Sequence, residues 1–117
     1  VEALKERHPG VPIIGFPRGA GGLILDYAEK TGVTAVGLDT AVPLKRIAAS
    51  LPNGMPVQGN LDPMRLVAGG SGLEARVREI VDALRARPHI FNLGHGVVPE
   101  TPIAHVEQVL RVLKGGA

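Results

Sequence analysis

A pattern that occurs four times constrains the fold of this chain most. Each copy has a short apolar segment, then a turn rich in glycine, proline, aspartate or asparagine, then a helical segment. The apolar segments are residues 11–16, 33–38, 55–58 and 90–93, and the first and last of them are expected to form buried strands. Strands that alternate with helices form parallel sheets with right-handed crossovers. The sequence therefore predicts an α/β fold, either a small open doubly wound sheet or part of a barrel.

Chain length bears on the second architecture. A complete eight-stranded α/β barrel needs about 250 residues, and the chain has 117. If the fold is a barrel, the chain could supply a (β/α)4 half of it, and a single domain over residues 1–117 is the default for this length. A half barrel leaves two open sheet edges that need another chain or a second copy. The start at Val1 suggests a fragment or a processed form.

Capping residues predict where several helices begin. Asp62 is a candidate cap for a helix after the third strand, and Ser71 with Glu74 forms a capping-box pattern for the next helix. Thr101 is expected to cap the last helix, with Pro102 at its first position. The best amphipathic helix is predicted to bury one stripe: Leu73, Val77, Ile80, Val81 and Leu84.

Composition excludes several classes of function. Thirteen basic and 11 acidic residues are scattered without a basic face, which argues against nucleic-acid binding. With no cysteine, the chain cannot form disulfides, zinc–thiolate sites or a cysteine nucleophile. No apolar run approaches the roughly 20 residues of a membrane span, and no signal peptide is evident. A cytoplasmic location is compatible with these features.

His95 is the main candidate functional residue. It lies directly after the fourth apolar segment, between Gly94 and Gly96, whose missing side chains let the backbone come close to a ligand. In α/β proteins ligands bind beyond the carboxyl ends of the strands. A histidine there can donate to a carboxylate or act as an acid or base near neutral pH. We therefore expect His95 to lie in a ligand site.

Other polar residues follow the remaining strands. Arg18, in a glycine-rich loop, could hold an anion, but the loop lacks the Lys-Ser/Thr of a P-loop and a plain loop residue is the simpler interpretation. Asp39, Asp62 and Asn60 are also at strand exits, where the favoured role is to cap helices or hold loop amides.

The other histidines, His8, His89 and His105, are interpreted as structural, because they lie at a helix end, a strand start and a helix surface. No His, Asp or Glu pair has metal-ligand spacing, so a metal site is not expected.

Five segments together resemble a known family. They are Phe16–Gly19, Val36–Asp39, Gln58–Pro63, Asn92–Gly96 and Pro99–Pro102. The residues of these segments, their order and their spacing are similar to those of the carboxyl-terminal part of uroporphyrinogen decarboxylase. The resemblance covers essentially the whole chain. It implies a TIM barrel of which this chain is roughly the second half, strands five to eight.

The resemblance also implies an activity. The family is a carboxy-lyase of haem and porphyrin biosynthesis that removes the acetate carboxylates of uroporphyrinogen III to give coproporphyrinogen III. It uses no metal or organic cofactor, because the protonated pyrrole itself accepts the electrons. The matching motif implies that His95 binds substrate by donating to a carboxylate, not as a nucleophile. No catalytic residue is assigned to this chain.

The resemblance also shows what this chain lacks. The family's central aspartate and its amino-terminal substrate-binding residues belong to segments absent here. We therefore expect the isolated chain to be inactive and to need the missing amino-terminal half as its partner. The family also suggests a cytoplasmic homodimer without membrane or nucleic-acid partners.

Two alternatives stay open. Related cobalamin-associated methyltransferases share the barrel, although their zinc–thiolate chemistry needs cysteine. The chain could instead be a non-catalytic half-barrel assembly module whose open edges pair with another copy.

Overall fold

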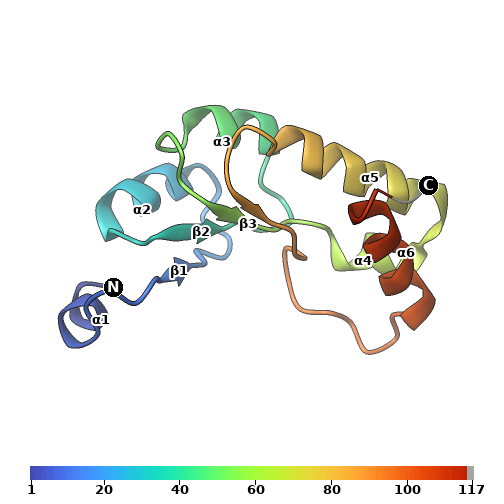
Figure 1. Cartoon of the computed structure of the whole chain (residues 1–117), viewed down its shortest axis with the longest axis horizontal. Helices are drawn as coiled ribbons and strands as arrows, with labels where there is room; N and C mark the ends of the chain where they lie inside the picture. Colours follow the sequence, from blue (N-terminus) through green and yellow to red (C-terminus); the bar gives the residue numbers. More distant parts are fainter. Residues whose placement is uncertain (116–117) are drawn as a thin grey trace.

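The computed structural model describes residues 1–115, so the last two residues of the predicted domain 1–117 lie outside the described part. Short strands alternate with helices along the chain (Figure 1). The elements are α1 (Glu2–Arg7), β1 (Ile14–Gly15), the 3-10 helix η1 (Gly21–Leu23), α2 (Ile24–Thr31), β2 (Ala35–Gly37), α3 (Leu44–Ser50), β3 (Val57–Gln58), α4 (Pro63–Ala68), α5 (Gly70–Ala83), β4 (His89–Ile90) and α6 (Ile103–Leu113).

The four strands form one parallel sheet in the order β1-β2-β3-β4. A parallel bridge between Leu61 and Leu93 continues the β3–β4 pairing beyond the strands. A doubly wound sheet reverses its strand order and carries helices on both faces, whereas a barrel adds each strand beside the previous one. The sequential order, with α2, α3 and α5 on one side of the strands in Figure 1, confirms the predicted (β/α)4 half of a TIM barrel.

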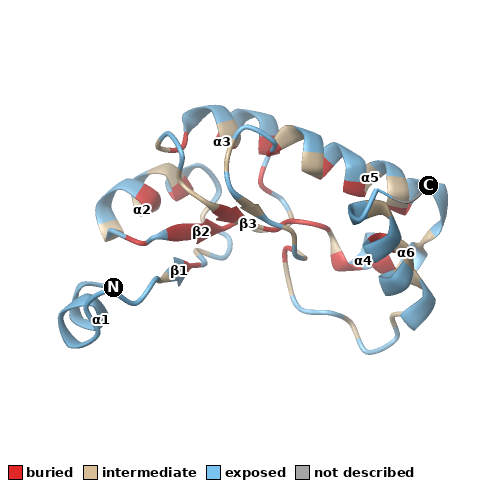
Figure 2. Cartoon of the chain, in the orientation of Figure 1, coloured by how far each residue is buried: buried red, intermediate tan, exposed pale blue. Residues whose placement is uncertain are grey.

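The core lies between the strands and the helices that cover their outer face. Figure 2 shows buried residues along β2, at β3 and on the inward faces of these helices. In α5 the predicted stripe is confirmed, although Val81 is only partly buried. Its fully buried members, each at most 1% exposed, are Leu73, Val77, Ile80 and Leu84.

The opposite, inner side of the sheet is open in the described part of the chain. Ile14 and Phe16 are 45% and 46% exposed, and Ile90 in the edge strand β4 is 49% exposed. The prediction that residues 11–16 and 90–93 form buried strands is therefore wrong for these side chains. The interior of a complete barrel is filled by side chains from all eight strands, and only four strands contribute here.

One of the predicted helix starts is confirmed. The Asp62 carboxylate accepts a hydrogen bond from the Met64 amide at 2.9 Å, and Pro63 is the first residue of α4. This arrangement satisfies one of the free amides at the helix start.

Two other predicted caps are wrong. Helix α5 begins at Gly70 without a side-chain cap, because Gly69 with φ 64° leads α4 directly into α5 and leaves Ser71 inside the helix. Helix α6 begins at Ile103, one residue later than predicted, so Pro102 takes the capping position. The Thr101 hydroxyl is buried and has no hydrogen-bond partner among the described residues.

Candidate functional site

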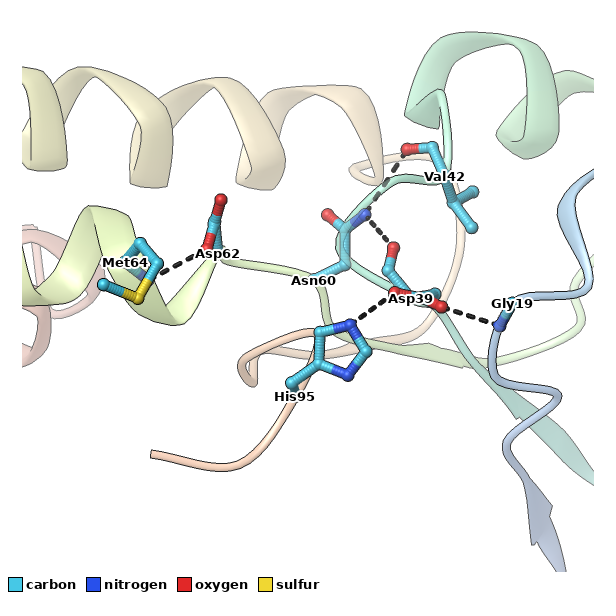
Figure 3. Close-up of polar contacts among 7 residues, drawn as sticks. All are labelled: Gly19, Asp39, Val42, Asn60, Asp62, Met64 and His95. Atoms are coloured by element: carbon cyan, nitrogen blue, oxygen red, sulfur yellow. Dashed lines mark hydrogen bonds and ion pairs between the residues drawn. The ribbon is translucent and has the colours of Figure 1, made fainter. Parts of the chain in front are cut away.

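Loops from three strand exits meet at the carboxylate of Asp39, which follows β2 (Figure 3). One carboxylate oxygen, Oδ1, lies 2.7 Å from Nε2 of His95, in the loop after β4. The other oxygen, Oδ2, accepts a hydrogen bond of 2.8 Å from the amide of Gly19, in the loop after β1. The predicted candidate His95 and the predicted scaffold residue Asp39 therefore form one unit.

Asn60, which follows β3, links the exit of that strand to the Asp39 loop. Its side-chain nitrogen donates to the backbone carbonyl of Asp39 at 2.9 Å and, more weakly, to that of Val42 at 3.4 Å. The side chain is 1% exposed, and its oxygen has no partner among the described residues. This supports the scaffold role that the sequence suggested for Asn60.

The environment of Asp39 favours its ionised form. The Gly19 amide lowers the pKa of the Asp39 carboxyl below its ordinary value of 3.8, with further lowering by His95 and by the amides of Thr40 and Ala41, while burial opposes the change. Holding loop amides is the role that the sequence predicted for Asp39. An ionised carboxylate has only acceptor oxygens, so the His95 Nε2 atom donates to it.

His95 forms part of the wall of a hollow of about 400 Å³ on the open inner side of the sheet. Its side chain is 32% exposed, and the Phe16 ring meets the imidazole edge-on with centroids 6.2 Å apart. The lining residues are mostly apolar: Ile14, Phe16, Gly37, Leu38, Gln58, Asn92, Leu93, Gly94, His95, Gly96 and Val97. The hollow can therefore seat a largely apolar ligand beside one imidazole.

Sequence reasoning did not assign Gln58 and Asn92 to this hollow, although both contribute to its lining. Gln58 is the last residue of β3, and a polar residue at the end of an otherwise apolar strand is the signal that could have found it. The Asn92 side-chain oxygen accepts from the Leu93 amide at 2.8 Å.

The two glycines around His95 differ in role. A side chain at Gly94 would overlap the backbone and hydroxyl of Thr40, whereas a side chain at Gly96 would meet open space. Gly94 therefore lets the loop after β4 approach the loop after β2. This close approach is to the protein backbone, where the sequence suggested an approach to a ligand.

The other candidates lie in structural settings. Arg18 is exposed. His89 Nε2 lies 2.6 Å from the Gly59 carbonyl, His105 Nδ1 lies 2.8 Å from the Leu66 carbonyl, and His8 ends α1. The carbonyl contacts of His89 and His105 support their structural interpretation, and for His8 that interpretation stays a prediction.

Two further features of residues 1–115 concern metal ions and membranes. No group of three or more His, Asp or Glu side chains could hold a metal ion there. None of the described helices is both long and apolar enough to cross a membrane.

Comparison with known proteins places these features in a family. Residues 1–115 match the family model described as uroporphyrinogen decarboxylase (URO-D). Curated relatives named uroporphyrinogen decarboxylase include proteins of Hyphomonas neptunium, 63% identical over 97% of this chain and 33% of the relative, and Sphingopyxis alaskensis, 56% identical over 99% and 34%. The chain thus spans about a third of the length of these relatives. By the match over nearly all its length, this chain belongs to the uroporphyrinogen decarboxylase family.

Proposed function

We propose that this chain is the carboxyl-terminal part of a uroporphyrinogen decarboxylase, which converts uroporphyrinogen III to coproporphyrinogen III by loss of its acetate carboxylates. The observation that carries the proposal is the match to the family model over residues 1–115. The four parallel strands in sequential order support it, because they have the arrangement of one half of a barrel. The carboxyl-terminal position rests on the sequence motifs.

His95 is the substrate-binding residue in this proposal. The apolar walls of the hollow suit a pyrrole ring, and the imidazole suits one of the substrate's carboxylates. Because Nε2 faces Asp39, the atom that meets the substrate is Nδ1, which donates when the ring is protonated. His95 thus binds and orients the substrate without forming a covalent bond to it.

The proposal extends to partners and location. A segment supplying the rest of the barrel would cover the open inner face and both sheet edges, β1 and β4. We expect that segment to bring the residues that carry out decarboxylation, and the complete enzyme to be a cytoplasmic homodimer. The isolated chain would then be inactive.

A chimera tests the proposal directly. The 114 aligned residues of the Hyphomonas neptunium relative are replaced by this chain, and anaerobic conversion of uroporphyrinogen is measured. We expect an active chimera and an inactive isolated chain. A folded chimera without activity, while the unaltered relative is active, would refute the assignment.

Replacing His95 in the active chimera tests the site. His95→Ala should lower kcat/KM about 10- to 100-fold, the effect of losing a hydrogen bond between charged groups, with most of the change in KM. His105→Ala is the matched control, because His105 contacts the Leu66 backbone carbonyl and neither residue lines the hollow. Unchanged kinetics in His95→Ala would remove this residue from the site.

A further inference from the structure

We infer that Asp39 is a positioning residue for His95: it fixes the imidazole with the Nε2 hydrogen toward Asp39 and Nδ1 free for an anionic group of the substrate. The inference deepens the proposed function and rests on it for the identity of the ligand. The arrangement of Asp39 and His95 rests on the geometry alone. The positioning role and the identity of the ligand can therefore be refuted separately.

Asp39 is placed to act through His95. Its side chain is 13% exposed and does not contribute to the hollow, whereas the His95 side chain is 32% exposed and does. Figure 3 shows the second ring nitrogen of His95 on the side turned away from Asp39. Within residues 1–115, the pair with Asp39 is the only ion pair that His95 makes.

Asp39 is itself held from two sides. The Gly19 amide occupies Oδ2 at 2.8 Å, which leaves Oδ1 for the imidazole. The backbone carbonyl of Asp39 accepts from the buried Asn60 side chain at 2.9 Å. An imidazole fixed by such a partner loses little orientational freedom when a ligand binds.

The charge of Asp39 also decides which proton His95 carries. Because an ionised carboxylate only accepts hydrogen bonds, Nε2 must hold a hydrogen whether the ring is neutral or protonated. A neutral ring then has a bare Nδ1, which repels a carboxylate. A protonated ring has an Nδ1 hydrogen that binds one.

Asp39→Asn separates this role from a merely structural one. The Gly19 amide still requires an acceptor, so the asparagine oxygen should face Gly19 and its NH2 group should face His95. The neutral imidazole must then accept at Nε2 and carry its hydrogen on Nδ1. The substitution is therefore expected to reverse the tautomer while keeping the loop contacts.

The first test is nitrogen-15 NMR of the histidine rings in this chain, at a pH where His95 is neutral. The His95 signal is assigned by its loss in His95→Gln. We expect the Nε2–H tautomer in the unaltered chain, the Nδ1–H tautomer in Asp39→Asn, and no change in Asp62→Asn, where asparagine can still cap α4. An Nδ1–H tautomer in the unaltered chain, or an unchanged one in Asp39→Asn, overturns the inference.

The second test uses the chimera, so it can be carried out even if the isolated chain with Asp39→Asn does not fold. Asp39→Asn should raise KM about 5- to 10-fold with a smaller effect on kcat. The double variant with His95→Ala should be no worse than His95→Ala alone, because Asp39 acts through that ring. If the effects of the two substitutions on KM multiplied in the double variant, the inference would be overturned. A chimera without activity refutes the proposed function and leaves the NMR test to decide the positioning role.

Discussion

The Asp39 carboxylate contributes to the stability of the folded chain in a way that depends on pH. Its pKa in the folded chain is lowered from 3.8, first by the Gly19 amide and also by His95. A lowered folded pKa adds stability that is fully present above 3.8 and is lost as the pH falls through the lower folded value. The contribution of Asp39 therefore belongs to neutral and mildly acidic pH.

Asp39→Asn should remove this contribution. We expect the free energy of unfolding of this variant to be about 1 kcal/mol lower than that of the unaltered chain at pH 7. The difference should shrink as the pH is lowered below 3.8, which urea unfolding at a series of pH values can measure. A difference that stays constant down to acid pH would contradict the ionised state assigned to Asp39.

Gly94 and Gly96 allow a matched comparison of two single-residue substitutions. Gly94→Ala would drive a methyl group into Thr40, whereas Gly96→Ala would place it in open space. Neither glycine has a positive φ, so the comparison isolates steric contact from backbone strain. We expect Gly94→Ala to lower the free energy of unfolding by about 1–3 kcal/mol and Gly96→Ala to change it little. Equal effects in thermal unfolding would refute the close packing of the two loops.

At the scale of elements, Arg87 joins the segment after α5 to the segment between α3 and β3. Its guanidinium donates to the carbonyls of Pro52 and Met55, each at 3.1 Å, and to that of Ala48. These carbonyls lie at and beyond the end of α3, where helix carbonyls lack helical partners. One planar side chain thus satisfies three acceptors that a lysine could not reach together.

Arg87→Lys should therefore lower the free energy of unfolding by about 1–3 kcal/mol, measured by urea unfolding. Arg85→Lys is the control, because Arg85 is 76% exposed and pairs with Asp82 within one helical turn. Such exposed pairs contribute about 0–1 kcal/mol. If both substitutions had the same small effect, the bridging role of Arg87 would be wrong.

The elements also show what local sequence could predict. Apolar spacing identified the buried stripe of α5, because burial on one face of a helix imposes a period, and short apolar segments between helices identified the parallel strands. The caps at Ser71 and Thr101 failed because Gly69 and Pro102 altered the helix starts. The Asp39–His95 contact joins the exits of β2 and β4, with β3 between them in the sheet, so no spacing along the chain indicates it.

At the scale of the whole molecule, the described sheet has two unpaired edges and one open face. Strands β1 and β4 end the sheet, and apolar side chains such as Ile14 and Phe16 are nearly half exposed on its inner side. Unpaired edges and exposed apolar surface both favour association. The rest of a barrel would cover these surfaces in the proposed complete enzyme, but another copy can cover them when the chain is alone.

We therefore expect the isolated chain to self-associate through this inner side, with a mass in sedimentation velocity that rises with concentration. Phe16→Glu should weaken the association because it buries a charge at the contact. Leu23→Glu is the control, since Leu23 is 68% exposed and lies in η1, outside the lining of the hollow. Equal weakening by both variants would place the contact elsewhere. A chain that stays monomeric at every concentration would mean that the open half sheet is stable without a cover, and that barrel closure is not driven by these exposed side chains.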